Sequence, residues 1–347
     1  MAAPEQYMQR CLQLALLGAG TVAPNPMVGA VLVYNDTIIG EGWHQQYGQA
    51  HAEVNCLHSV TDNNRALINK STLYVSLEPC AHFGKTPPCT DLIIANKIPT
   101  VVIACTDQNI QVNGKGISRL KAAGINVITG VLENEAMALN RRFFTFNTQA
   151  RPYIILKWAQ SSDAKIAGAV NTARLHISNN VSNRLVHQWR SQEAAIMVGT
   201  NTALYDNPSL TTRLWPGKNP ARILLDSNLR IAAAHQLLDD AAPTIVFNSK
   251  KEGQEGNINF CKIAFDQTML PTLLAKLHTL NIQSVLVEGG ARLLQSFIDA
   301  GYWDEARVIV NTTLVVGEGV AAPVLKNYRT AGTQHLLTDT IYNYQPL

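Results

Sequence analysis

The sequence has little charge and few aromatic residues. Only 15% of its 347 residues are Asp, Glu, Lys or Arg, and 7% are Phe, Trp or Tyr, whereas average proteins carry about 25% charged residues. The net charge of +3 is too small to provide the basic surface that binds duplex nucleic acid. We therefore expect a small-molecule substrate and no nucleic-acid partner. Because 46% of the residues are apolar, the low charge favours a compact, soluble protein over a disordered one.

Cysteines and long apolar runs are also scarce. Six cysteines in a chain of this length do not form the dense disulfide framework of a small secreted domain. No apolar run approaches the ~20 residues that span a bilayer. The apolar stretch 12–23 lacks the basic leader of a signal peptide, because Glu5 offsets Arg10. These absences predict a cytoplasmic protein with no membrane partner.

The pattern of elements in the first half predicts an α/β domain. Apolar strand-like runs alternate with helical stretches, which is typical of a largely parallel sheet covered by helices on both faces. A turn at Asn35 and Asp36 favours a hairpin between the first two strands. We expect strands at 28–34, 37–42, 72–77, 100–105 and 126–129, and helices at 4–17, 50–59, 89–96, 115–123 and 133–144.

The length leaves room for a second domain, since domains average ~150 residues. The polar, proline-containing segment 147–152 precedes a new apolar strand at 153–158, so we place the boundary there and the domains at 1–146 and 151–347. The second half again alternates strand and helix patterns. We expect further strands at 194–198, 222–226, 244–248, 285–288 and 307–311, and helices at 180–192, 268–280 and 291–301.

A constellation of metal-ligand residues is the most informative feature of the first half. His51 is followed by Glu53 two residues later, and Cys80 and Cys89 come further along the chain. One imidazole and two thiolates leave a fourth position of tetrahedral zinc open for water, as a catalytic site requires. Glu53 is placed to take the proton of that water and to pass it to a leaving amine. We expect His51 and Glu53 in the first turn of a helix, and Cys89 at the start of another.

Two other interpretations of these residues are open. Cys80 and Cys89 are small residues of a kind often buried in cores, and His51 can be a satisfied core histidine. A closed structural zinc site would need a fourth ligand, for which the candidates are Cys56, His58 and His82. The order of the residues favours the catalytic site, because His-x-Glu followed by Pro-Cys and a further Cys is the signature of zinc nucleobase and nucleotide deaminases.

One turn in the second half has the sequence features of a phosphate-binding site. Gly289 and Gly290 end an apolar strand, and a helical pattern starts at Ala291. Glycines there would let a phosphate approach the free N–H groups of a helix N-terminus. An ordinary strand-to-helix turn without a ligand has the same pattern.

The spacing of the cysteines leads to a specific family. Eight residues separate them, in Glu78-Pro-Cys-Ala-His-Phe-Gly-Lys-Thr-Pro-Pro-Cys89, where the usual form has two. This segment closely resembles the bifunctional riboflavin-biosynthesis deaminase/reductase family, as do Ala23-Pro-Asn-Pro-Met-Val-Gly-Ala-Val31, Gly40-Glu-Gly-Trp-His44 and Asp206-Asn-Pro-Ser-Leu-Thr-Thr-Arg213. The resemblance implies a cytidine-deaminase-like three-layer α/β/α domain with Zn²⁺, and then a dihydrofolate-reductase-like α/β domain that uses NADPH.

The resemblance also implies contacts for particular residues. In the deaminase domain, the substrate would be bound by Asn25, His82, Lys85 and Thr86. In the reductase domain, NADPH would be bound by Gln160, His176, Thr202, Asp206, Ser227, Gly290, Ala291, Arg292, Leu293, Leu294, Gln295 and Ser296. The phosphorylated substrate of that domain would be bound by Arg174, Arg190, Leu210, Arg213 and Glu288. Lys157 and Asp163 are further candidates to assist opening of the ribose ring.

The second half departs from the family pattern in two segments. The family usually has Ser-Leu-Asp-Gly where this chain has Ser-Ser-Asp-Ala, ending at Ala164. His176 stands where an aromatic cofactor contact is expected, and Arg174 where a small substrate contact is expected. These departures bear on the geometry of the cofactor site and on the rate of the reductase.

The hypothesis from the sequence is a homo-oligomeric enzyme for two consecutive steps. The first domain would deaminate 2,5-diamino-6-(5-phosphoribosylamino)pyrimidin-4-one, and the second would reduce the ribosyl chain of the resulting uracil to ribityl. One alternative is a tRNA or other polynucleotide deaminase with an appended domain, which predicts a basic, aromatic-rich groove. Another is a deaminase whose second domain has lost its activity and serves as an interaction module.

Overall fold

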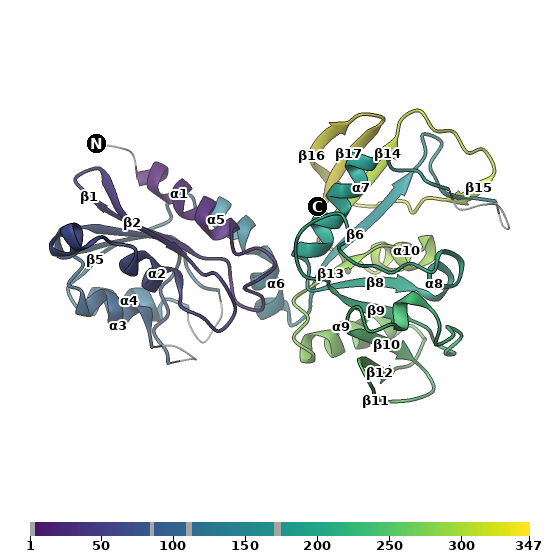
Figure 1. Ribbon diagram of the computed structural model, residues 1–347, viewed down its shortest axis with the longest axis horizontal. Helices are drawn as coiled ribbons and strands as arrows, with labels where there is room; N and C mark the ends of the chain where they lie inside the picture. The colour runs from purple at the N-terminus through teal and green to yellow at the C-terminus, as the bar shows by residue number, and fades with distance from the viewer. Residues whose placement is uncertain (1–3, 84–86, 109–112, 170–174) are drawn as a thin grey trace. The chain divides into compact units, whose positions relative to one another are not determined.

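The computed structural model describes residues 4–83, 87–108, 113–169 and 175–347. The chain divides into two compact units, Met1–Ala150 and Arg151–Leu347 (Figure 1). Each unit is built around its own sheet. Within the described residues, no helix combines the length and the apolar composition that a membrane crossing requires.

The first unit has a five-stranded sheet in the order β2-β1-β3-β4-β5. β1 pairs antiparallel with β2 and β3, whereas β3, β4 and β5 are parallel. The strands are β1 (Gly29–Tyr34), β2 (Thr37–Trp43), β3 (Thr72–Leu77), β4 (Thr100–Cys105) and β5 (Asn126–Thr129). The helices are α1 (Pro4–Leu16), α2 (Ala52–His58), α3 (Cys89–Ala95), α4 (Lys115–Ala122), α5 (Glu133–Leu139) and α6 (Arg141–Gln149), with a 3₁₀ segment at Asp62–Lys70.

Helices cover both faces of this sheet. Alternate side chains of β1 enter two different cores: Ala30 and Leu32 pack with α2, α3 and α4, and Val31 and Val33 pack with α1, α5 and α6. This alternation follows from the two-residue period of a strand that is buried on both sides. Figure 1 shows α1 and α5 on one side of the sheet and α2, α3 and α4 on the other. The predicted three-layer α/β/α domain is confirmed.

One predicted helix is two helices in the structure. The sequence predicted a single helix at 133–144, but α5 ends at Leu139 and α6 begins at Arg141. The break falls on Asn140, whose side chain is buried. Its Oδ1 accepts a hydrogen bond from the Met27 N–H at 2.8 Å, and its Nδ2 donates one to the Met27 carbonyl at 2.9 Å. The helix breaks because this side chain is held by a loop far away in the sequence.

The second unit has a ten-stranded sheet in the order β11-β12-β10-β9-β8-β13-β6-β14-β17-β16. Its centre, from β12 to β14, is parallel, and antiparallel strands form both edges. The main strands are β6 (Tyr153–Gln160), β8 (Ala195–Gly199), β9 (Ala221–Leu225), β10 (Thr244–Asn248), β12 (Ile258–Lys262), β13 (Ser284–Val287) and β14 (Glu305–Asn311). The edges add β11 (Gly253–Glu255), β16 (Tyr328–Leu336) and β17 (Asp339–Pro346), and β7 (Lys165–Gly168) pairs separately with β15 (Gly319–Ala321).

Helices cover both faces of the parallel centre. α9 (Met269–Thr279) and α10 (Ala291–Asp299) pack on one face, against side chains such as Ile154 and Met197. α7 (Asn180–Gln192) and α8 (Thr200–Asp206) lie on the opposite face, where the cores contain Ile155 and Val198. A short 3₁₀ turn spans Gln236–Leu238. The expected α/β reductase-type domain is confirmed, but the hairpin of β16 and β17 was not predicted, because most of β16 is exposed and lacks an apolar alternation.

Candidate active sites

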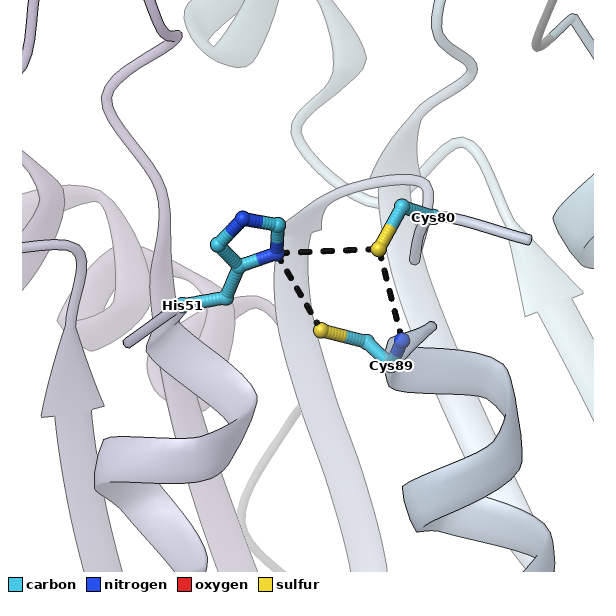
Figure 2. Close-up of side chains that lie close together, drawn as sticks. All are labelled: His51, Cys80 and Cys89. Carbon is cyan, nitrogen blue, oxygen red and sulfur yellow. Dashed lines mark hydrogen bonds between the residues drawn. The ribbon is translucent and has the colours of Figure 1, made fainter. Parts of the chain in front are cut away.

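The three predicted metal ligands lie together in the first unit. The Nδ1 atom of His51 is 3.6 Å from Cys80 Sγ and 3.3 Å from Cys89 Sγ (Figure 2). All three atoms lie within 4.8 Å of one another. Zn–N distances of about 2.0–2.1 Å and Zn–S distances of about 2.3 Å place tetrahedral ligand atoms about 3.5–3.8 Å apart. The spacing and the donor atoms therefore fit a zinc ion.

Helix ends and a strand end position the three ligands. His51 is the N-cap residue of α2, one position before the first turn in which it was predicted. Cys80 follows β3, and Cys89 is the first residue of α3 behind Pro88. The backbone N–H of Cys89 donates a hydrogen bond to Cys80 Sγ at 3.3 Å. An N–H donor and a helix N-terminus both favour negatively charged sulfur.

The protonation of the two thiols is linked. Hydrogen bonds from Cys89 and His51 lower the pKa of Cys80 to about 4, although burial opposes this shift. The same contact with Cys80, together with burial, raises the pKa of Cys89. The hydrogen bond to Cys80 also raises the pKa of His51. The two thiols therefore share a proton that a metal ion would displace, because thiols bind metals in the deprotonated form.

The alternative of a closed structural zinc site lacks a fourth ligand. In the part of the chain that the structure describes, the group of candidate metal ligands contains His51, Cys80 and Cys89 and no further His, Cys, Asp or Glu. Cys56 belongs to α2 and is buried in the hydrophobic core, and burial raises its pKa. His82 is exposed. A site with three protein ligands is the catalytic form.

Glu53 lies next to the ligand group without joining it. It is the second residue of α2 and is only 3% exposed. Burial raises the pKa of its carboxyl group, and the negative charge of Cys80 adds to the effect. A raised pKa makes a carboxylate a better proton acceptor. This is the property that proton transfer in a deamination requires.

A cavity of about 310 Å³ opens beside the ligand group. It is lined by the predicted residues Asn25, His51, Glu53, Cys80 and His82. The structure therefore brings Asn25 and His82 to the same cavity as the metal ligands. Lys85 and Thr86, which were predicted to bind the same substrate, lie outside the described residues. The wall also contains Leu77, Asp107 and Phe143.

His44 in this wall was not predicted as a site residue. Its Nδ1 is 3.0 Å from the Ala50 carbonyl, and its Nε2 is 3.1 Å from the Asn25 side-chain nitrogen. Burial lowers the pKa of His44 and so favours the neutral ring. A carbonyl can only accept, so Nδ1 carries the proton and Nε2 accepts a hydrogen bond from Asn25. His44 thereby orients the Asn25 amide, and its place in the motif that ends at residue 44 was the only signal in the sequence.

Glu78 is a second residue that sequence reasoning missed. Its buried carboxylate accepts hydrogen bonds from the backbone N–H groups of Asp107, Gly114, Gly116 and Ile117, at 2.8–3.2 Å. These groups belong to the connection after β4 and to the start of α4. Glu78 directly precedes Pro79 and Cys80. Its carboxylate therefore links the loop that carries Cys80, which we call the metal-ligand loop, to the connection after β4 and to the start of α4.

In the second unit, three predicted or candidate residues form one buried ion cluster. Arg190 on α7 donates two hydrogen bonds to the Glu288 carboxylate, each of 2.8 Å, and Lys157 Nζ on β6 is 3.8 Å from Glu288 Oε2. Burial opposes ionisation of Glu288, but Arg190 and Lys157 lower its pKa to about 2. Burial lowers the pKa of Lys157. A lowered pKa makes an ammonium group a stronger proton donor.

The glycine turn adjoins Thr202. Gly290 is the N-cap residue of α10, and the Gly199 N–H donates a hydrogen bond to the Gly289 carbonyl at 3.2 Å. A Cβ atom at Gly289 or Gly290 would lie 3.3 or 3.2 Å from Thr202 Oγ1. The turn and Thr202 thus meet beyond the carboxyl ends of β8 and β13. The strand order reverses between these two strands, which is where open α/β sheets bind nucleotides.

Other predicted cofactor residues are distributed around this turn. Ser227 follows the end of β9, Asp206 ends α8, and Gln160 ends β6 with its Oε1 accepting a hydrogen bond from Trp158. Ala291, Arg292, Leu293, Leu294, Gln295 and Ser296 all belong to α10. The side chains of Leu293 and Leu294 are buried in the core, so the prediction that they contact the cofactor can hold only for their backbone.

The remaining predicted residues have different environments. The side chain of Leu210 is buried in the core beside α8, so its prediction as a substrate contact is also limited to the backbone. Arg213 donates hydrogen bonds to the hydroxyl groups of Ser209 and Thr211. His176 is exposed, and Arg174 lies outside the described residues.

Comparison with known proteins identifies both halves. Residues 1–105 match the cytidine and deoxycytidylate deaminase zinc-binding region, and residues 152–338 match the RibD C-terminal domain. The fold and the metal-ligand group therefore define a zinc-dependent deaminase domain that is joined to a reductase domain.

The relatives of this protein match nearly the whole length of its chain. The riboflavin biosynthesis protein RibD of Aquifex aeolicus is 41% identical, over 91% of this chain and 89% of that protein. RibD of Escherichia coli is 35% identical, over 90% and 88%. A crystal structure of a deaminase/reductase from Thermotoga maritima has a TM-score of 0.90 at 35% identity, over 99% of this chain and 98% of that chain. The chain belongs to the RibD family of riboflavin biosynthesis proteins. It is a bifunctional deaminase and reductase whose cofactors are zinc and NADPH.

Proposed function

We propose that the two domains catalyse consecutive steps on one phosphorylated pyrimidine. The first would deaminate 2,5-diamino-6-(5-phosphoribosylamino)pyrimidin-4-one, and the second would reduce the ribosyl chain of 5-amino-6-(5-phosphoribosylamino)uracil to ribityl. The observation that carries the proposal is the group of His51, Cys80 and Cys89 beside the buried Glu53. The Thermotoga maritima relative is named as a diaminohydroxyphosphoribosylaminopyrimidine deaminase and 5-amino-6-(5-phosphoribosylamino)uracil reductase. Its similarity to both halves favours this reaction pair over a polynucleotide deaminase.

In the deaminase domain, His51, Cys80 and Cys89 would hold the zinc ion. Zinc in such a site lowers the pKa of a bound water towards neutrality and so supplies a nucleophile. Glu53 would take the proton from that water and deliver it to the amine that leaves the pyrimidine. Asn25, oriented by His44, would hydrogen-bond the pyrimidine edge, and His82, Lys85 and Thr86 would contact the rest of the substrate.

In the reductase domain, the buried ion cluster would surround the reacting end of the substrate. NADPH supplies a hydride to C1′ of the ribosyl group. Opening of the ring then requires a proton on the ring oxygen, and Lys157 is the proposed donor because burial lowers its pKa. Glu288 and Arg190 would hold Lys157 and the substrate in place. Asp163 is less suited to this role, since its carboxylate accepts hydrogen bonds from the Val316 and Gly317 N–H groups at 3.0 and 2.7 Å.

The same proposal covers the location and assembly of the enzyme. Cys80 and Cys89 must stay reduced to bind a metal, and the described structure contains six free cysteines, which supports a cytoplasmic location.

We also propose a homo-oligomer. The nine-residue strand β16 at the edge of the large sheet supports this, because edge strands readily pair between chains. Light scattering on the purified protein tests it.

One coupled assay tests the reaction pair. With the diaminopyrimidine phosphate as substrate, ammonia release and NADPH oxidation should be equimolar. Glu53→Gln should retain zinc and lose about 10²–10⁴-fold in ammonia release, since a general acid and base contributes that much. Cys80→Ser should lose zinc and ammonia release together. Glu135→Gln, at an exposed glutamate, is the control. Full ammonia release by Glu53→Gln would exclude the assigned role.

A further inference from the structure

The second unit contains a second group of buried charges, which the proposed function does not use. It consists of Arg307 and Glu305 on β14 and of Glu193, the C-cap residue of α7, and we call it the Arg307 cluster. Arg307 Nε donates a hydrogen bond to Glu305 Oε1 at 2.6 Å, and Arg307 Nη2 lies 4.0 Å from Glu193 Oε1. Each of the three residues is only 5–6% exposed.

Burial makes the Arg307 cluster costly. Two of the side chains that contact it, Trp189 and Tyr153, belong to the apolar core between α7 and the sheet. One guanidinium group faces two carboxylates there, and Arg307 Nη1 is buried with no hydrogen-bond partner in the described part of the chain. Apolar side chains of similar size often stabilise such a position better than buried ions do. Stability is therefore a poor explanation for the cluster, and a role in fixing local geometry is a better one.

Arg307 contacts the last turn of α7 at two neighbouring points. Its guanidinium carbon lies over the ring of Trp189, 4.8 Å from the ring centre, a distance at which a cation attracts an aromatic face. Its ion pair with Glu193 is the other contact. Trp189 and Glu193 are four positions apart, so they are neighbours on the helix surface. The side chain of Arg307 thus fixes the end of α7 against β14.

The same turn of α7 presents Arg190 to the buried ion cluster. Arg190 directly follows Trp189 and donates its two hydrogen bonds to Glu288. Arg307 is also the register partner of Lys157 on the neighbouring parallel strand β6. Because paired residues of neighbouring strands point to the same face of a sheet, Lys157 and Arg307 both face α7. The two groups of charges therefore share one face of the sheet and one turn of one helix.

We propose that Arg307 is a positioning residue of the reductase, which fixes the last turn of α7 and thereby holds Arg190 against Glu288. Arg307 acts through α7 and is not itself a catalytic residue. The inference rests on the proposed function, because it takes the buried ion cluster as the reacting end of the substrate site. If the last turn of α7 moves, Arg190 retreats from Glu288, and Lys157 loses the arrangement of charges around it.

A retreat of Arg190 should change the pH dependence of the reductase. Lys157 donates a proton in the proposed reaction, so activity falls as the pH rises through its pKa. Burial lowers the pKa of Lys157, Glu288 raises it, and the charge of Arg190 lowers it. Burial raises the pKa of Glu288, and the charged or titratable groups around it lower that pKa: Arg190, Lys157 and His187. Without Arg190 nearby, both pKa values rise, and the alkaline limb of the pH profile moves to higher pH.

A neutral version of the Arg307 cluster tests this role without leaving a buried charge unpaired. The triple variant combines Arg307→Leu, Glu193→Gln and Glu305→Gln. It should lower kcat for NADPH oxidation about 10–100-fold, since small misplacements of reacting groups cost this much, and move the alkaline limb to higher pH. KM for NADPH should not change, because α10 and its glycine turn cover the other face of the sheet. Hydrogen exchange should become faster in the last turn of α7.

A conservative variant and a core variant complete the test. Arg307→Lys keeps the positive charge and loses the planar guanidinium group, so kcat should fall less and the alkaline limb should move in the same direction. Leu274→Ala is the matched control. Leu274 is buried on α9, on the opposite face of the sheet. Its substitution should lower thermal stability and leave kcat, the pH profile and the exchange of α7 unchanged.

The outcomes separate a positioning role from a purely structural one. An unchanged kcat and pH profile in the folded triple variant would overturn the inference, and so would the same changes in Leu274→Ala. If the triple variant does not fold, the same measurements on Arg307→Lys decide the question. Failure of the unmodified enzyme to oxidise NADPH with the deaminated substrate would instead overturn the proposed function, and hydrogen exchange would still test the contact between Arg307 and α7.

Discussion

Ala164 illustrates how one residue can carry backbone strain. It has a φ of +57°, in the left-handed region that costs a residue with a Cβ atom roughly 1–2 kcal/mol. Its N–H donates a hydrogen bond to the Ser161 carbonyl at 3.0 Å, and its carbonyl accepts one from the Ala322 N–H at 2.9 Å. These bonds hold the turn between β6 and β7 in place. The family pattern has a glycine at this position, and the left-handed conformation is the physical reason.

Replacing this residue with glycine should therefore stabilise the protein. We expect Ala164→Gly to raise the free energy of unfolding of the second unit by about 0.5–1 kcal/mol, because the released strain exceeds the added entropy of the unfolded chain. Urea unfolding of the full chain measures the change. Ala167→Gly in the neighbouring strand β7 should destabilise instead, since glycine weakens a strand. Equal effects of the two substitutions would contradict the strain argument.

At the scale of elements, the metal-ligand loop depends on how closely α4 approaches it. Gly116 lies in the first turn of α4, and a Cβ atom there would be 2.1 Å from the Pro79 carbonyl oxygen. The Gly116 N–H also donates to Glu78 at 2.8 Å. The absence of a side chain at Gly116 therefore lets α4 contact the residues directly before Cys80.

A methyl group at this contact should separate the two elements. We expect Gly116→Ala to lower the free energy of unfolding by about 3 kcal/mol, at the upper end for overpacking, and to weaken zinc retention. Gly124→Ala is the control, because a Cβ atom there meets nothing within 4 Å and only its φ of +82° is unfavourable. The control should cost about 1 kcal/mol and keep its zinc. Thermal unfolding and zinc content per chain measure both effects, and normal zinc content in Gly116→Ala would disprove the role of the contact.

At the scale of the whole molecule, the two catalytic sites belong to separate hydrophobic cores. The core clusters of the first unit contain only residues up to 144, and those of the second begin at residue 153. The metal ligands lie in the first unit, whereas the ion cluster and the glycine turn lie in the second. Loss of metal from one unit should therefore leave the chemistry of the other intact.

Metal removal tests this independence. A chelator that strips the zinc should abolish ammonia release, because His51, Cys80 and Cys89 then hold no ion. Oxidation of NADPH with the deaminated substrate should continue at its normal rate. Addition of Zn²⁺ should restore ammonia release. Parallel loss of both activities would show that the reductase domain also depends on the metal.

The elements and the metal ligands could be predicted from short stretches of sequence. Strand β1 and helix α2 follow from local apolar periodicity, and the ligand group follows from fixed spacings of His, Glu and Cys. The helix break at Asn140 could not be predicted in this way, because its cause is Met27, 113 residues earlier. The hairpin of β16 and β17 was also missed, since β16 is exposed along most of its length and carries no alternation of apolar residues.

The sequence by itself determined the α/β class and the family, and it predicted two domains and a metal site at His51, Cys80 and Cys89 beside Glu53. These features depend on residues close together in the chain or on motifs with fixed spacing. Only the tertiary structure decided that His44 orients Asn25, that Glu78 ties the ligand loop to α4, and that Arg307 contacts Trp189 on α7. The residues in each of these arrangements are 19 or more positions apart, and such residues come together only where the helices pack on the sheets.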